Sequence, residues 1–171
     1  MTLQAIYDYA NKLLDASLND ISDIIEYLNE AQRYIVGLDP LQASATGVLD
    51  ETHSITLPSD FLALKAIVID DYDYSTSGEL WAGVITLPVG YTEGTYVLKY
   101  YRSPVLLDGN VTDQVPDIHE KYHPLLAVYA AKMYNLVEDD QEIKAAYMDE
   151  FVQGVSNLKT TDGANQRFFN Y

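Results

Sequence analysis

The stretch VPDIHEKYHPLLAVYAAKMYNLV, residues 115–137, determines how the rest of the chain is interpreted. Its second half, residues 125–136, is mostly apolar and predicts a helix that supplies core residues. Its first half contains His119, Glu120 and His123 in the order H-E-x-x-H, the signature of zinc metallopeptidases. Two hypotheses, a catalytic helix and a helix that serves only as scaffold, therefore compete for the same residues.

A zinc peptidase needs two histidines one helical turn apart, a glutamate as general base and a third ligand. His119 and His123 have this i, i+4 spacing, and Glu120 stands in the position of the base. Glu142 lies downstream and is available as the third ligand. The metallopeptidase is therefore kept as an alternative, with His119, His123 and Glu142 as its metal ligands.

Two features of the same stretch argue against that alternative. Pro124 has no N–H for the carbonyl of Glu120, its ring clashes with that carbonyl, and it disfavours a helical conformation at His123. Asp117 and Glu120 also match a capping box, with an acid at the N-cap and Glu at N3. We therefore expect a capped helix start with no catalytic residue, no metal and no cofactor.

The composition excludes several classes of protein. Cysteine is absent, which excludes disulfides, thiolate metal sites and cysteine nucleophiles. The 26 acidic residues outnumber the ten basic ones and give a net charge of −16, so a surface that binds nucleic acid or anionic membrane is not expected. The sequence shows no transmembrane segment and no signal peptide at its start.

The first 42 residues predict a helical hairpin. Thr2 is expected to cap a helix that ends near residues 17–19, with an apolar stripe of Leu3, Ile6, Tyr7, Ala10, Leu13 and Leu14. Asp20 or Ser22 is expected to cap a second helix, with an inward face of Ile21, Ile24, Ile25, Leu28, Ala31 and Ile35. Gly37 is its predicted stop, and Pro40 prevents the helix from resuming.

Residues 43–107 predict a β insertion. Gly47, Asp50 and Glu51 are expected in a loop. Three or four strands separated by turns are then predicted, within residues 53–57, 64–70, 80–87 and 95–102. In the last of these, alternation places Tyr96, Leu98 and Tyr100 on one face.

Residues 116–159 predict a second helical hairpin, whose last helix runs to about Leu158 with Ile143, Tyr147, Phe151 and Val155 along the same stripe. Residues 160–171 form a tail that ends in the aromatic segment RFFNY. The predicted fold is α+β: a single domain over residues 1–171, a bundle of about four helices in two hairpins, with a small antiparallel β-sheet or sandwich inserted between helices 2 and 3.

Five segments, in this order, resemble the head-to-tail connector (adaptor) proteins of tailed bacteriophages, including the tail-tubular protein A type. They are LNEAQRYIVG (28–37), ITLPSDFLALKAIVID (55–70), VLKYYRSPVLL (97–107), PDIHEKYHPLLAVYAAKMYN (116–135) and EFVQGVSNLK (150–159). The resemblance covers residues 3–159. It implies a structural virion protein without catalytic residues, assembled in the host cytoplasm and located at the neck.

The resemblance also implies partners: a homo-oligomeric ring, typically dodecameric, docked on the portal protein and joined to tail or head-closure proteins. DNA passes through the lumen of such rings without specific binding, and the acidic composition suits that role. Arg167, Phe168, Phe169 and Tyr171 are the expected partner-binding residues, and the tail either packs on its own domain or reaches a neighbour. Another neck or tail-completion protein remains a further alternative.

Overall fold

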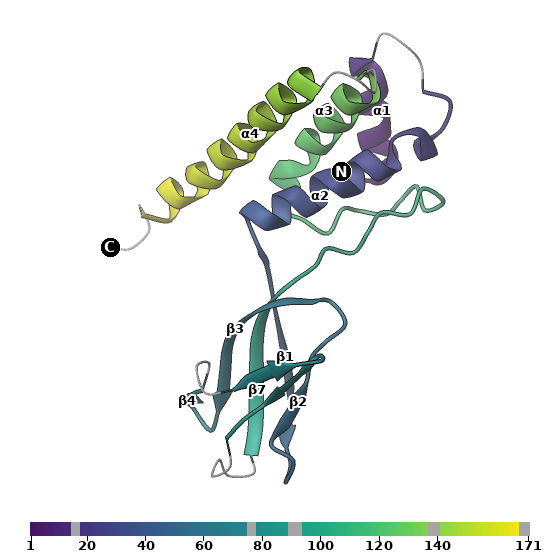
Figure 1. Ribbon diagram of the computed structural model, residues 1–171. Coiled ribbons are helices and arrows are strands. Elements are labelled where there is room, and N and C mark those ends of the chain that lie inside the picture. The colour runs from purple at the N-terminus through teal and green to yellow at the C-terminus, as the bar shows by residue number, and fades with distance from the viewer. Residues whose placement is uncertain (15–17, 75–77, 89–93, 137–140, 168–171) are drawn as a thin grey trace. The chain divides into compact units, whose positions relative to one another are not determined.

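A computed structural model describes residues 1–14, 18–74, 78–88, 94–136 and 141–167 of the chain; for residues 141 and 161–167 it describes the backbone only. The chain divides into two compact units (Figure 1). The helical unit comprises Met1–Asp39 and Pro104–Tyr171, and the sheet unit comprises Pro40–Ser103. The predicted single domain over residues 1–171 stays a prediction.

The helical unit is organised around one buried helix. Its four α-helices are α1 (Leu3–Leu13), α2 (Ile25–Leu38), α3 (His123–Tyr134) and α4 (Gln141–Arg167). Apolar residues lie on nearly all sides of α3, which packs against α1, α2 and α4 (Figure 1). The predicted core helix is confirmed, but the main contacts of α1 and α2 are each with α3, so these two do not form a simple hairpin.

Helix α1 begins as predicted and ends earlier than predicted. The Thr2 hydroxyl accepts a hydrogen bond from the Ala5 N–H, which confirms the cap. Leu14 already has an extended backbone, so the predicted end near residues 17–19 is wrong. Two tertiary contacts favour the early end, because Asn11 Oδ1 accepts from the Leu18 N–H and Tyr7 donates to the Leu18 carbonyl.

Helix α2 is preceded by a short 3₁₀ turn, η1 (Ile21–Asp23), which Asp20 caps through the Ser22 N–H. Asp20 is therefore a cap as predicted, although of η1 and not directly of α2. The helix continues through Gly37 to Leu38, so the predicted glycine stop is wrong. It ends at Asp39, whose φ and ψ are −132° and 81°, because Pro40 disfavours a helical conformation at the residue before it and cannot donate a helical hydrogen bond.

Helix α4 extends to Arg167, beyond the predicted end near Leu158. Within it, the Thr160 hydroxyl donates to the carbonyls of Ser156 and Asn157, an arrangement that a helix accommodates. Phe151 and Val155 are buried as predicted, whereas Ile143 is exposed. The predicted tail over residues 160–171 is thus helical up to Arg167.

The segment that leads back from the sheet unit to α3 is fixed to the helical unit. The Asn29 side chain donates to the Leu107 carbonyl and accepts from the Leu107 N–H, at 3.1 and 2.7 Å. At the start of α1, the N–H groups of Leu3 and Gln4 donate to carbonyls of the same segment, those of Gln114 and Thr112. A buried asparagine therefore satisfies both backbone groups of one residue.

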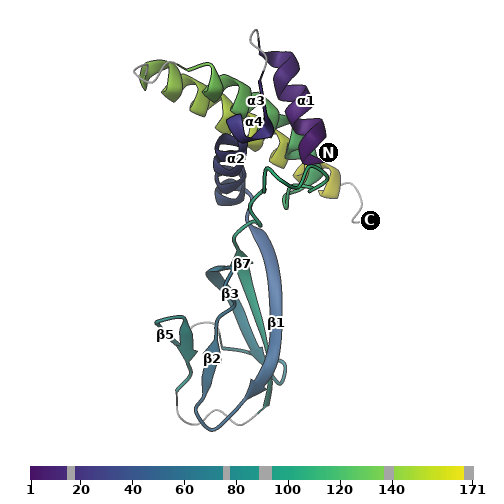
Figure 2. The same ribbon diagram turned by 90° about the vertical axis from the view of Figure 1, so that its right-hand side faces the viewer.

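The sheet unit contains two antiparallel sheets around one core (Figure 2). The first has the order β1-β7-β3-β4, and the second β2-β6-β5. Their bounds are β1 (Leu41–Leu49), β2 (Ser54–Thr56), β3 (Phe61–Ile69), β4 (Tyr72–Asp73), β5 (Glu79–Trp81), β6 (Val84–Thr86) and β7 (Gly94–Arg102). The shared core consists of Leu49, Ile55, Ile67, Ile69, Ile85, Leu87, Leu98 and Tyr100. The α+β class and the insertion of sheets between α2 and α3 are confirmed.

Sequence reasoning missed two features of these sheets. Residues 41–49, expected to be partly loop, form β1 and pair with β7 along their whole length. The single strand expected within residues 80–87 is instead a hairpin of β5 and β6. Its two turn residues, Ala82 and Gly83, both have positive φ (48° and 79°), as tight antiparallel hairpins require.

The prediction of a loop at Gly47 is wrong, because this glycine lies in a strand and makes room for a neighbouring side chain. It pairs with Tyr96 across β1 and β7, and the Tyr96 ring lies over it. A Cβ added at Gly47 would lie 2.5 Å from the Tyr96 hydroxyl oxygen and 2.6 Å from its ring carbon Cζ. A glycine in the middle of a strand therefore marks close approach by a neighbouring side chain.

We predict that Gly47→Ala lowers the free energy of unfolding by about 1–3 kcal/mol, because the Tyr96 ring must move aside. Gly37→Ala is the matched control, since its Cβ would meet nothing within 4 Å and alanine favours helix, so it should stabilise by about 0.4–1 kcal/mol. Urea denaturation measures both changes. Equal effects of the two substitutions would contradict the packing explanation.

Candidate functional site

The H-E-x-x-H stretch does not lie on one α-helix. Residues Glu120–Tyr122 form a 3₁₀ turn, η2, and His119 is its N-cap with an extended backbone (φ −59°, ψ 136°). His119 is exposed, and its Nδ1 accepts a hydrogen bond from the Lys121 N–H. The regular helical turn that would place both histidines on one face is therefore absent here.

His123 is buried and has both ring nitrogens engaged. Its Nε2 lies 3.2 Å from the Ile118 carbonyl oxygen, and its Nδ1 lies 2.7 Å from the amino group of Met1. An ammonium group only donates, so Nδ1 accepts and Nε2 donates, which is the neutral form of the ring. Burial lowers the pKa of His123, which favours the same form.

Two of the reasons given against the zinc motif are wrong. Pro124 sits in the first turn of α3, where proline is tolerated, and His123 has helical dihedrals (φ −55°, ψ −40°). The predicted capping box of Asp117 and Glu120 is wrong, because His119 is the N-cap and Glu120 is the first residue of η2 and not the third. The Asp117 carboxylate accepts from the Val105 N–H at 3.1 Å. The start of α3 instead follows directly from η2.

Glu142 lies in the first turn of α4 and is exposed. Within residues 1–14, 18–74, 78–88, 94–136 and 141–160, no group of three or more His, Cys, Asp and Glu side chains could hold a metal ion. The structure therefore does not assemble His119, His123 and Glu142 into a metal centre among these residues.

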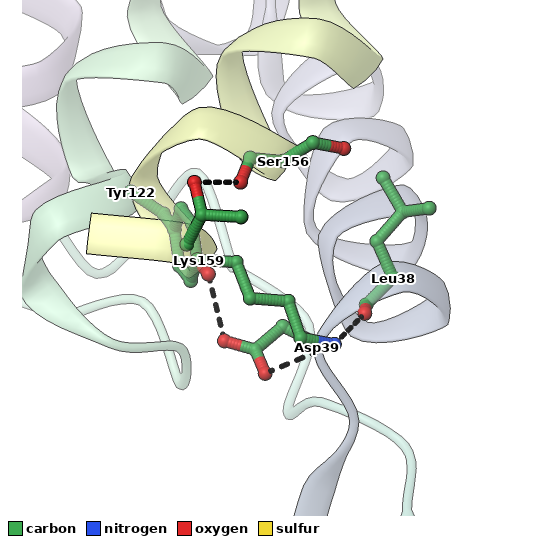
Figure 3. Close-up of polar contacts among 6 residues, drawn as sticks. Leu38, Asp39, Tyr122, Ser156 and Lys159 are labelled. Carbon is green, nitrogen blue, oxygen red and sulfur yellow. Dashed lines mark hydrogen bonds and ion pairs between the residues drawn. The ribbon is translucent and has the colours of Figure 1, made fainter. Parts of the chain in front are cut away.

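A polar network joins three elements where the chain leaves the helical unit (Figure 3). The Tyr122 hydroxyl donates to Asp39 Oδ2 at 2.7 Å, and Lys159 Nζ donates to the Leu38 carbonyl at 2.6 Å. Lys159 Nζ also lies 3.8 Å from Asp39 Oδ1. Lys159, although it belongs to α4, therefore satisfies one of the free carbonyls at the C-terminal end of α2 and complements the dipole of that helix. The network holds Asp39, at which the chain leaves the helical unit, between η2 and α4.

The polar side chains of this network fix the position of the chain at the end of α2. Tyr122 is almost fully buried, and its burial, with the hydrogen bond to the Asp39 carboxylate, raises its pKa to about 12. The phenol is thus a neutral donor to a carboxylate, which is a strong, oriented hydrogen bond. The partly exposed Lys159–Asp39 pair contributes little, roughly 0–1 kcal/mol.

An open cavity of about 280 Å³ lies between α3 and α4. Leu125, Val128 and Tyr129 of α3 and Phe151 and Gly154 of α4 form much of its lining. Lys132 and Glu150 form an ion pair at this cavity, and the Lys132 ammonium lies 4.8 Å from the centroid of the Tyr147 ring. Mostly apolar walls with a few polar groups are typical of binding pockets.

Large apolar side chains are also exposed on the sheet unit. Trp81 is 83% exposed at the end of β5, beside Leu80 at 56%. Both precede the Ala82-Gly83 turn, so they lie at the tip of the β5–β6 hairpin. An exposed tryptophan is unusual on a protein surface that has no partner, because tryptophan is typical of interface hot spots.

The predicted partner-binding residues are not positioned by the structure. Phe168, Phe169 and Tyr171 lie outside the described residues, and for Arg167 only the helical backbone is described. No described helix is both long enough and apolar enough to cross a membrane.

A comparison with protein families finds a match between residues 1–168 and the family model described as SU10 adaptor protein. No curated protein matches the chain.

Sequence reasoning missed the network and the cavity. Tyr122 occupies one of the two free positions of the H-E-x-x-H pattern, which assigns it no role. Asp39 before Pro40 was a signal in the sequence, because it marks a helix end whose free carbonyls need partners. The cavity could not be found from one sequence, because it depends on how α3 and α4 pack. The exposure of Trp81 was hidden by the prediction of one continuous strand.

We predict that the two histidine substitutions differ. His119→Ala should lower the free energy of unfolding by only about 0.5 kcal/mol, because its exposed side chain gives up a single capping hydrogen bond, from the Lys121 N–H. His123→Ala should lower it by about 1–3 kcal/mol, because a buried carbonyl loses its donor. Chemical denaturation measures both, with elemental analysis for zinc. Stoichiometric zinc that both variants lose would instead restore the metallopeptidase.

The His123 environment also predicts a dependence of stability on pH. Because the folded pKa lies below the ordinary value of about 6.5, the stabilisation is complete above pH 6.5 and is lost as the pH falls further. His123→Gln should remove this part of the acid sensitivity, which thermal unfolding at pH 7.5 and 5.5 would show. An unchanged slope in the variant would contradict the prediction.

For the network, we predict that Tyr122→Phe lowers the free energy of unfolding by about 0.5–1.5 kcal/mol near neutral pH. The raised pKa of Tyr122 means that the wild-type advantage is complete below about pH 10 and is lost as the pH rises towards 12. Denaturation at pH 8 and pH 11 measures the difference. A gap that stays constant with pH would show that the phenol does not titrate with unfolding.

Proposed function

The chain belongs to the SU10 adaptor protein family, and from this premise we propose that it is a structural protein of the virion neck. In this proposal it forms a ring that docks on the portal protein and joins the capsid to the tail, as a head-to-tail connector of the tail-tubular protein A type. The ring is dodecameric and assembles in the host cytoplasm. The observation that carries the proposal is the family match over residues 1–168.

The charge of the chain supports this role. A net charge of −16 repels the phosphate backbone, so a ring of such subunits gives passing DNA nothing to hold. A connector needs that property because the genome must leave the capsid through its lumen. The acidic composition is thus a functional property and not only an aid to solubility.

The chemistry of the helical unit supports a scaffold and not an enzyme. His123 is neutral, buried and bonded on both ring nitrogens, so it is not free to bind substrate or metal. Tyr122, Asp39 and Lys159 use their polar groups to hold helix ends. A connector needs such rigid positioning, because identical subunits must present the same surfaces around a ring.

Arg167, Phe168, Phe169 and Tyr171 complete the proposal as the segment that contacts the portal or a tail protein. An arginine among aromatic side chains has the composition of an interface hot spot. The first residue of the segment, Arg167, is the last residue of α4, the longest helix of the described chain. In this arrangement portal contact and ring formation use different parts of the molecule.

We predict that the purified protein forms rings, alone or when mixed with the portal protein of the same phage. Ring formation should appear as a discrete high-mass species in mass photometry and as annular particles in negative-stain electron microscopy. A chain that stays monomeric with the portal and does not bind it would overturn the proposed function. Binding only to tail proteins would instead support a neck or tail-completion protein.

A chain truncated after Gln166 is the matched variant. It should still form rings and should lose at least about tenfold in portal affinity, because it lacks the hot-spot residues. Unchanged portal affinity would remove these residues from the proposal and leave the ring intact.

A further inference from the structure

The tip of the β5–β6 hairpin has the properties of a projecting anchor. Trp81 and Leu80 are 83% and 56% exposed, and the Ala82-Gly83 turn beside them carries no charge. An added Cβ at Gly83 would meet nothing within 4 Å, so the turn is open to solvent. Tryptophan offers 150–250 Å² of surface to bury, the largest contribution that one side chain makes to an interface.

The cavity between α3 and α4 has the complementary properties. Its walls carry Leu125, Val128 and Phe151, which suit an indole ring, and it holds about 280 Å³. The Glu150 carboxylate is at hand to accept the indole N–H, which needs an acceptor when buried. The Lys132 ammonium already lies over one aromatic ring, that of Tyr147, so it is placed to contact a second.

We propose that Trp81 at the hairpin tip of one copy of this chain inserts into the α3–α4 cavity of the next copy. The inference rests on the proposed ring and names the contact that builds it. An anchor and a cavity at two different places on one molecule make a heterologous contact, and contacts of this kind close into rings when the rotation permits.

Charge favours a second copy as the occupant. Copies that each carry a charge of −16 repel one another, so their contact must be formed by locally neutral surfaces. The hairpin tip, residues 80–83, is uncharged, and the two charged side chains that line the cavity, Lys132 and Glu150, form an ion pair. Both surfaces therefore meet this condition within a strongly acidic chain.

The test uses two variants that each remove one side of the contact. Trp81→Ala removes the anchor, and Gly154→Trp fills the cavity, since a Cβ at Gly154 would point at Leu125 from 3.4 Å. Each variant alone should weaken the contact at least tenfold and abolish rings in mass photometry. Mixed one to one, they should form heterodimers and nothing larger, because the pair retains one intact contact. Tyr72→Ala, which alters a side chain that is 69% exposed on the same unit, is the control and should still form rings.

Wild-type fluorescence provides a second readout that needs no variant. Trp81 is the sole tryptophan, so its emission should shift to shorter wavelength as rings form and should stay red-shifted in the monomer. Rings formed by Trp81→Ala, or unchanged emission on assembly, would overturn the inference and leave the proposed function standing. Emission that is already at short wavelength in the monomer would show that the Trp81 side chain is buried within its own chain. Loss of portal binding in a Trp81→Ala variant that still forms rings would place Trp81 in the contact with the portal. Each of these last two results would also overturn the inference. Failure of the wild type to form rings with the portal would overturn the proposed function itself.

Discussion

The burial of α3 on nearly all sides is the constraint on which the helical unit depends. The polar groups at the start of a helix surrounded by α1, α2 and α4 need partners, because an unpaired buried donor or acceptor costs about 1–3 kcal/mol. The start of α3 meets this demand with His123, which bonds to the Ile118 carbonyl and the Met1 amino group. Tyr122, one residue earlier, is buried as a neutral donor to Asp39. Residues of the H-E-x-x-H pattern thus supply the hydrogen bonds that the start of a buried helix requires.

The same need for hydrogen-bond partners explains where other polar side chains of this unit lie, namely where the chain leaves for the sheet unit or returns from it. Asn29 satisfies both backbone groups of Leu107 where the chain comes back from the sheet unit. Lys159 satisfies a carbonyl at the end of α2, just before the chain departs from the helical unit. In the proposed ring every subunit must present the same surfaces, so its junctions need to be held, and these side chains do so without enlarging the core. These residues therefore contribute to function through position and not through chemistry.

The α+β class, the two helices before the sheets and the core helix after them could be predicted, because apolar periodicity and proline positions are local signals. β1 was missed because Gly47 and its small neighbours resemble a loop, and only Tyr96 on a distant strand explains them. The Asp117 capping box was wrong because His119 is the N-cap, and the Asp117 carboxylate has a non-local partner in Val105. Pro124, expected to break the helix, lies in the first turn of α3, so that reason against the zinc motif is wrong. What the sequence did not reveal depends on contacts between segments far apart in the chain.

The pairing of β1 with β7 has a consequence for how the sheet unit is joined to the rest of the chain. Leu41 and Arg102 are direct partners in the register, so the first and last strands of the sheet unit bring its two ends together. A module whose ends are adjacent can be inserted into a host or removed from it with little strain on either part, as domain insertions in other proteins show. The helical unit can therefore accept another module in place of residues 40–103 if the ends of that module are equally close.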